Sequence, residues 1–130
     1  MCDQILRIEL AKMFTNFVIN ILSRQPDESR KCGFIDMTNA NQEQRLYAQT
    51  ACQLGIMGLE YDGSPSTVFN PNSYVTRAEF ATAFSRVLFG GENNGNASCR
   101  YCDHMFALKK ADIITNMSPD LLELRAFIMF

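Results

Sequence analysis

The stretch Cys99-Arg100-Tyr101-Cys102-Asp103-His104 holds the side chains of this chain that are best suited to chemistry. Two cysteines separated by two residues match one half of a tetrahedral zinc site, and the same spacing is typical of thiol-based redox proteins. A structural zinc site requires four ligands, however, and the chain has only one such pair. A small metal or redox module is therefore one hypothesis. We favour loop cysteines that hold neither metal nor cofactor.

No other set of residues has the pattern of an active site. His104 is the only histidine, and no motif builds a Ser/His/Asp or Cys/His arrangement around it. Asp36 and Asp62 lie among turn-forming residues, but neither belongs to the Asp-x-Asp-x-Asp-Gly pattern of a calcium loop. We expect no catalytic residue, no metal and no cofactor, and hence a protein that is not an enzyme.

The other cysteines bear on the compartment. Five cysteines in 130 residues are many for a cytosolic domain, but an odd number cannot all pair within one chain. Cys32 precedes a predicted helix and Cys52 lies near its end, so the intervening chain is long enough to fold back along that helix. A disulfide between Cys32 and Cys52 and two buried thiols both remain open.

A third candidate is Arg77, which lies in the first turn of a predicted helix. Thr76-x-x-Glu79 is a capping box, in which each side chain accepts a hydrogen bond from the other residue's amide. A cation at this end of a helix adds to the positive end of the helix dipole, so an anionic ligand would favour it. The alternative is an ordinary exposed arginine, or one paired with a carboxylate.

Hydrophobic periodicity predicts that these residues are carried by helices. Apolar residues recur at spacings of three and four, which is the period of an amphipathic helix. Gly55 and Gly90-Gly91 supply stops, and the turn-rich segment from Gly58 to Tyr74 has Phe69 as its apolar anchor. The predicted helices cover residues 5–22, 41–54, 76–89 and 103–111, with a fifth that begins at Ser118.

The same spacing predicts which side chains are buried. The stripe of the first helix includes Met13, Phe17 and Ile21, that of the second Leu46, and that of the third Leu88. With 47% hydrophobic residues, 130 residues are enough for one core, so we expect one compact unit.

Charge and hydropathy exclude two classes of partner. The 12 basic residues are balanced by 14 acidic ones, which argues against a nucleic-acid binder. No apolar run reaches the roughly 18 to 20 residues of a transmembrane helix, so no transmembrane segment is expected. The first residues lack the basic flank and cleavage site of a secretory signal. We therefore expect either a cytosolic protein or a fragment of a longer one.

An internal repeat divides the chain. Arg7-Ile8-Glu9-Leu10-Ala11 resembles Arg77-Ala78-Glu79-Phe80-Ala81, and residues 51–57 are echoed by 108–114. Residues 1–31 then form the second half of one helix–loop–helix repeat, 32–91 a full repeat and 92–130 a shortened third. Because two helices cannot close a core alone, we expect the repeats to pack around a shared axis.

The middle repeat carries four motifs in a recognisable order. They are Phe34-Ile35-Asp36, the helix end Leu54–Gly58, the loop Asp62-Gly63 with Phe69-Asn70-Pro71-Asn72, and the helix start Thr76-Arg77-Ala78-Glu79-Phe80. In these motifs and their order the chain resembles the S-layer homology family.

The resemblance implies an all-α pseudo-threefold bundle of repeats, found in exported surface proteins, whose grooves bind acidic cell-wall polysaccharide without catalysis. It implies an extracellular location at the cell surface or wall. The residues implied in ligand binding are Arg77, Asp36, Gly58 and Arg7; those implied in the structural motif are Thr76, Glu79, Phe69, Pro71 and Glu9.

The outer repeats depart from the family pattern. Leu6 stands where the capping threonine belongs, and Glu123-Leu124-Arg125 reverses the order of charges in the third repeat. We therefore expect the middle repeat to hold the ligand site of a module that anchors a larger exported protein by binding a secondary cell-wall polymer. The alternative is a degenerate copy that packs against other surface-layer subunits.

Overall fold

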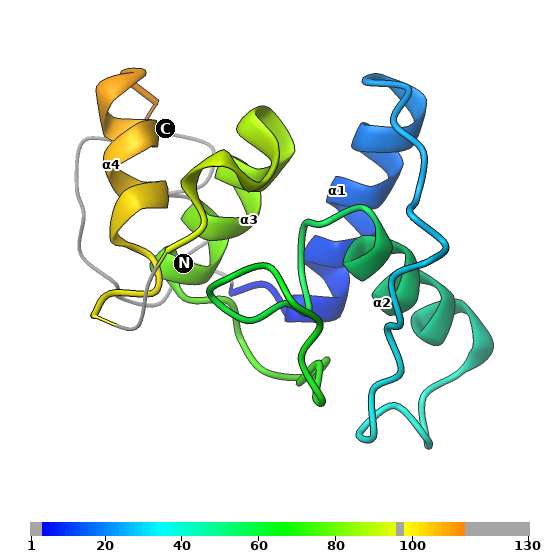
Figure 1. Cartoon of the computed structure of the whole chain (residues 1–130). Helices are drawn as coiled ribbons and strands as arrows, with labels where there is room; N and C mark the ends of the chain where they lie inside the picture. The colour runs from blue at the N-terminus through cyan, green and yellow to red at the C-terminus, as the bar shows by residue number, and fades with distance from the viewer. Residues whose placement is uncertain (1–3, 96–97, 114–130) are drawn as a thin grey trace.

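A computed structural model describes residues 4–95 and 98–113, and this part of the chain is all-helical (Figure 1). It has no strand within that range, only two isolated β-bridges. The predicted all-α class is therefore correct for the described residues, and the helix expected from Ser118 lies outside them. The elements are α1 (Arg7–Asn20), α2 (Gln42–Gln53), α3 (Arg77–Phe89), the 3-10 helix η1 (Gly90–Asn93) and α4 (Cys102–Lys110).

Local sequence explains where the helices begin. At α3 the Glu79 amide donates to Thr76 Oγ1 at 3.0 Å, and the Thr76 amide donates to Glu79 Oε1 at 2.9 Å, which completes a capping box. At α1 only half of that arrangement exists, because the Leu6 amide donates to Glu9 Oε1 at 2.8 Å but Leu6 has no side-chain acceptor. Asn41 caps α2.

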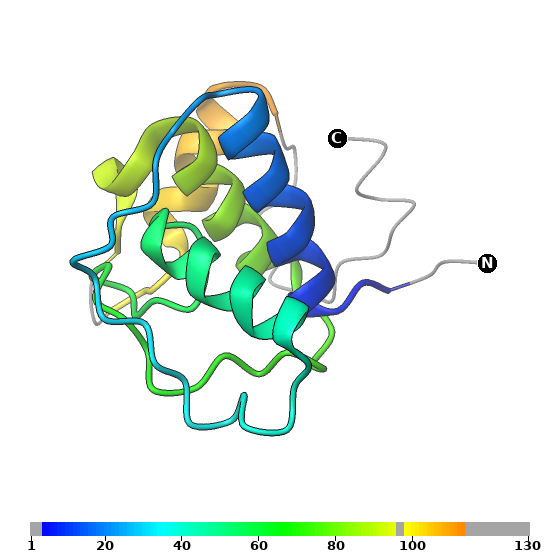
Figure 2. The same ribbon diagram turned by 90° about the vertical axis from the view of Figure 1, so that its right-hand side faces the viewer.

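The helices pack as two pairs, α1 against α2 and α3 against α4 (Figure 1). The two helices of the predicted middle repeat, α2 and α3, do not pack directly against each other, and the loop 54–75 lies between them. The segment 21–40 runs along the outside of the helices (Figure 2). None of the described helices is long and apolar enough to cross a membrane.

The core has two parts. The larger joins α1, α2 and α3 to the loop 54–75, and rings of Phe14, Phe80 and Phe84 meet in it at centroid distances of 5.5 to 5.9 Å. The smaller joins α3 to α4 through Ala78, Ala81, Met105 and Leu108. Since α3 contributes to both parts, it is the element that holds the two pairs together.

Several residues expected in the buried stripes are exposed. Ile21 is 70% exposed and Leu46 59%, and Met13, Phe17 and Leu88 are also exposed. Periodicity predicted the helices and many of their buried positions correctly, among them Leu10, Phe14 and Phe80, but it made each buried face too wide. The width of the face that packs depends on where the neighbouring helix lies. On α2 the buried positions are the small residues Ala48, Ala51 and Cys52.

The segment 21–40 is attached to the helix ends by side chains. Cys32 and Cys52 form a disulfide with their Cα atoms 6.1 Å apart. Arg30 donates to the Cys52 carbonyl at 3.0 Å, and Arg24 donates to the Leu54 carbonyl at 2.9 Å and the Val87 carbonyl at 3.0 Å. Cations at these carbonyls add donors at the C-terminal ends of α2 and α3, where the helix dipole favours positive charge.

We predict that Thr76→Ala lowers the free energy of unfolding by about 1 kcal/mol, because the Glu79 amide loses its acceptor at the start of α3. Urea unfolding followed by circular dichroism measures the change. Thr67→Ala, in the exposed part of the loop, is the matched control and should leave the stability near that of the wild type. Equal stability of Thr76→Ala and wild type would show that the cap contributes nothing.

Candidate functional site

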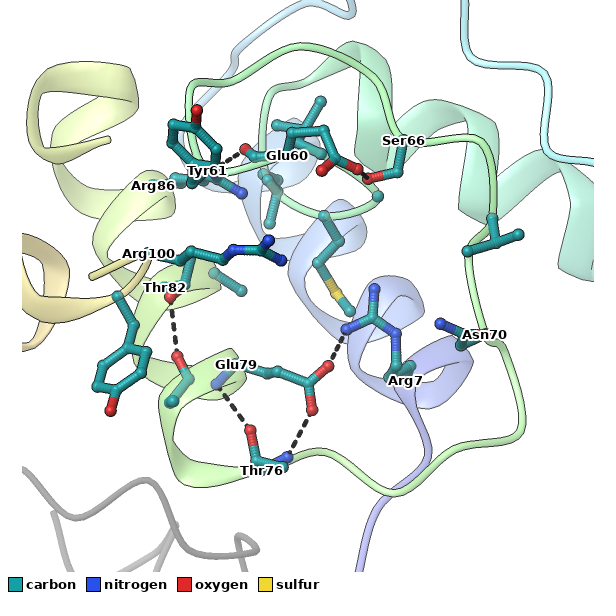
Figure 3. Close-up of a pocket in the computed structure, with 18 residues that line it drawn as sticks. Arg7, Glu60, Tyr61, Ser66, Asn70, Thr76, Glu79, Thr82, Arg86 and Arg100 are labelled. Atoms are coloured by element: carbon teal, nitrogen blue, oxygen red, sulfur yellow. Dashed lines mark hydrogen bonds and ion pairs between the residues drawn. The ribbon is translucent and has the colours of Figure 1, made fainter. Parts of the chain in front are cut away.

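A pocket of about 570 Å³ opens between the start of α1, the loop 56–70, α3 and the residues that precede α4 (Figure 3). It contains cations, acids and aromatic rings from all of these elements. The charged and aromatic side chains that line it are Arg7, Arg86, Arg100, Glu60, Glu79, Tyr61 and Tyr101.

Arg7 forms the α1 side of this pocket, and its position is determined by three contacts. Its Nε donates to the Phe69 carbonyl at 2.7 Å, its Nη1 pairs with Glu79 Oε2, and its guanidinium lies 5.2 Å from the centroid of the Phe69 ring. Because the side chain is only 14% exposed, these contacts keep the cation in one orientation. An anion in the pocket would therefore meet a preoriented charge.

The segments that precede α1 and α3 pair with each other and bring Arg7 to Glu79. The Val75 amide donates to the Ile5 carbonyl at 2.9 Å, and the Arg7 amide donates to the Ser73 carbonyl at 2.9 Å. These bonds form an isolated antiparallel bridge. The two helix starts that look alike in sequence therefore lie next to each other.

Gly58 lies at the pocket in a conformation that requires glycine, with φ of +75°. A Cβ there would lie 2.6 Å from Phe34 Cζ and 3.1 Å from Phe69 Cδ2. The rings of Phe34 and Phe69 meet edge to face with centroids 5.3 Å apart. Both rings pack against Gly58, and the absence of a side chain at this position leaves room for them at the edge of the pocket.

Asp36, expected to line a groove, instead supports the loop from outside the pocket. Its two oxygens accept from the amides of Phe69 at 2.9 Å and Asn70 at 2.7 Å. The Pro71 carbonyl accepts from the Ile8 amide at 3.1 Å, which attaches the same loop to α1. Phe69 itself is fully buried.

Arg77 is not among the residues that line this pocket. It stands at the first position of α3, as Arg7 stands at the first position of α1. Of the expected ligand residues, the pocket therefore gathers Arg7 and Gly58, together with Thr76 and Glu79.

Arg86 is a pocket residue that sequence reasoning missed. It is 3% exposed, its Nε donates to Asn94 Oδ1 at 2.9 Å, and its Nη2 donates to the Glu60 carbonyl at 3.0 Å. Burial, and to a smaller extent the nearby Arg30, lower the pKa of Arg86 to about 10, so it stays charged at neutral pH. No sequence signal separates it from an ordinary arginine late in an amphipathic helix.

Arg100 and Tyr101 were also missed, although the motif around them was not. Cys99 and Cys102 form a disulfide, so both residues lie within a ring closed by that bond. The Arg100 guanidinium lies 5.9 Å from the centroid of the Tyr61 ring across the pocket. Among the described residues, no group of three or more His, Cys, Asp and Glu side chains could hold a metal ion.

His104 lies in the contact between α3 and α4. It is fully buried, and its Nδ1 lies 2.7 Å from Ser85 Oγ. Its Nε2 has no hydrogen-bond partner among the described residues. Burial, reinforced by the positive charge of Arg86, lowers the pKa of His104 to about 4, so the neutral form is favoured.

Comparisons of this chain with protein-family models, with curated proteins and with solved structures gave no match. The argument for its function therefore comes from its own residues.

We predict that Gly58→Ala strongly destabilises the fold, by more than about 1 kcal/mol, because it combines an unfavourable φ with a clash against Phe34. Thermal unfolding measures the loss. Gly33→Ala is the matched control, because a Cβ at Gly33 meets nothing within 4 Å. A Gly58→Ala protein as stable as the Gly33→Ala protein would contradict the tight contact.

We predict that His104 makes stability depend on pH. Its pKa is near 6.5 when unfolded and about 4 when folded, so its contribution is present above pH 6.5 and is lost as the pH falls toward 4. Between pH 7 and pH 5 the wild type should lose about 2 kcal/mol more than His104→Asn, as judged by urea unfolding at each pH. Identical pH dependence of the two proteins would exclude the buried neutral histidine.

Proposed function

We propose that this chain is a non-catalytic anchoring module of the S-layer homology type. Within a larger exported protein, it binds an acidic cell-wall polysaccharide at the cell surface. The observation that carries the proposal is the pocket itself, which gathers Arg7, Arg86 and Arg100 with Tyr61 and Tyr101. Arginine donors suit carboxylate or phosphate groups, and tyrosine rings offer flat faces to sugars.

The charges in the pocket favour an anionic ligand. Glu79 already accepts from Arg7 and from the Thr76 amide, and Glu60 Oε2 accepts from Ser66 Oγ at 2.5 Å. The Arg7 pair compensates the charge of Glu79, whereas Glu60, whose partner is a neutral hydroxyl, keeps its own. The three lining arginines exceed the two carboxylates by one charge. Arg86 has neutral acceptors for its Nε and Nη2 bonds, so its full charge contributes to the potential in the pocket.

The similarity of two helix starts is an observation in favour of the family. The start of α1 resembles that of α3, with Glu9 and Glu79 each accepting from the amide three residues earlier. The pair α1 and α2 has the same order in the proposed repeats as the pair α3 and α4. We propose that residues 1–31, 32–91 and 92–130 correspond to three such repeats around a common axis.

Binding to isolated cell walls of the source organism tests the function. Co-sedimentation of purified protein with walls that retain their secondary polymer should be strong, and walls stripped of that polymer should bind little. Arg7→Ala should weaken binding by about tenfold or more, because it removes a charge-assisted hydrogen-bond donor. Arg7→Lys, which keeps the charge, should retain part of the binding.

Two variants serve as references for Arg7→Ala. Lys12→Ala removes a charge from the same helix at an exposed pair with Glu43, outside the pocket, and should bind like the wild type. Arg77→Ala tests the groove that the resemblance assigns to the middle repeat, and its effect should be smaller than that of Arg7→Ala. Undiminished binding of folded Arg7→Ala would overturn the assignment of this pocket.

One observation favours a second candidate, packing against other subunits of a surface layer. The apolar side chains of Met13 and Phe17 on α1 and of Ile21 at its C-cap lie four positions apart and are exposed in the described part of the chain. Such a row suits a protein contact. Concentration-dependent self-association that Phe17→Ser abolishes, without binding to walls, would favour this candidate over the first.

A further inference from the structure

The loop that carries Arg100 is constrained by a disulfide bond in addition to the helix that follows it. The disulfide between Cys99 and Cys102 closes a ring around Arg100 and Tyr101, and both residues line the pocket. The ring limits the backbone conformations on either side of Arg100 in every state of the protein in which the bond is intact.

Gly95 supplies a second constraint on the same loop. A Cβ at Gly95 would lie 2.7 Å from the Arg100 carbonyl oxygen and 2.8 Å from that of Cys99. Both neighbours are backbone atoms, so they could yield only if the loop moved. The chain before the loop therefore passes directly against it, and only glycine fits there.

Arg86 connects this loop to the opposite wall of the pocket. Its Nη2 bond to the Glu60 carbonyl holds the residue before Tyr61, and its Nε bond to Asn94 holds the residue before Gly95. The Arg86 side chain thus holds Glu60, the neighbour of Tyr61, and Asn94, which lies just before the loop of Arg100. Losing either bond would leave a buried charged donor unsatisfied, so the arrangement resists change.

Arg7 and Arg100 enter the pocket from opposite sides, with Glu79 between them and Thr76 below (Figure 3). Arg7 is fixed by its own contacts with α3 and the loop 56–70, whereas Arg100 is exposed and lies over an aromatic ring. A ligand long enough to reach both arginines would gain two contacts from one chain.

We infer that Arg100 and Tyr61 form a second subsite for an acidic sugar chain, beyond the unit held by Arg7, and that the Cys99–Cys102 ring, Gly95 and Arg86 position it. This inference rests on the proposed function. It assigns Arg100 and Tyr61 to the sugar unit next to the one that Arg7 holds. Tyr61 supports the Arg100 guanidinium, Arg100 meets an acidic group of the sugar chain, and Arg86 is a positioning residue.

Fragments of the wall polymer, released from isolated walls and sorted into one and three repeating units, test the subsite by isothermal titration calorimetry. Arg100→Ala should bind the three-unit fragment about tenfold more weakly than the wild type and the one-unit fragment within about twofold. Lys109→Ala, an equal loss of charge at an exposed position on α4, should bind both fragments like the wild type.

The outcomes separate this inference from the proposed function. Wild-type binding to walls and to both fragments, with Arg100→Ala unchanged on the three-unit fragment, overturns the subsite alone. Failure of the wild type to bind walls or either fragment overturns both. A loss on the one-unit fragment as large as that on the three-unit fragment would place Arg100 at the first subsite and also overturn the inference.

The positioning role has its own readout, which needs no ligand. Because Arg100 lies over the Tyr61 ring, its side-chain protons should show ring-current shifts in NMR spectra. Cys99→Ser/Cys102→Ser and, separately, Gly95→Ala should reduce these shifts and weaken three-unit binding, while the Cys32–Cys52 disulfide stays intact and the far-UV circular dichroism shows the helices still folded. Unchanged shifts and affinity in both proteins would show that the ring and Gly95 do not position Arg100.

Discussion

The rest of this structure depends on the hydrogen bonding of the Glu79 carboxylate, which joins the start of α3 to the start of α1. One oxygen accepts from the Thr76 amide and begins α3, and the other pairs with Arg7 at the start of α1. A single side chain thus joins a local helix cap to a contact between residues 72 positions apart. Because α3 packs on both α1 and α4, loss of the Glu79 contacts would disturb both helix pairs.

Arg86 illustrates how the same structure keeps a charge in its interior. Its Nε donates to the side-chain amide oxygen of Asn94 and its Nη2 to the Glu60 carbonyl, and burial lowers its pKa to about 10. Such a charge costs desolvation energy, which hydrogen bonds of good geometry offset. The result is a buried cation beside a pocket whose lining holds three arginines and two carboxylates, which suits the anionic ligand that we propose.

The starts of α1 and α3 have similar sequences but different surroundings. Arg7 is oriented by Phe69 and Glu79 and faces the described pocket, whereas Arg77 does not line it. Leu6 replaces the capping threonine at α1, yet Glu9 still accepts from its amide and the helix forms. A similarity in sequence therefore predicts similar helix starts, but whether each arginine lines the pocket depends on which loop lies beside it.

Four features could be predicted from the sequence: the all-helical class, the four described helices to within a few residues, the Thr76–Glu79 cap and the glycine stop at Gly55. All of them depend on interactions between near neighbours in the chain. Tertiary structure alone decided that Leu46 is exposed, that Asp36 supports a loop, and that Arg86 and Arg100 join Arg7 in one pocket. These outcomes depend on contacts between distant segments, and no local pattern encodes which segments meet.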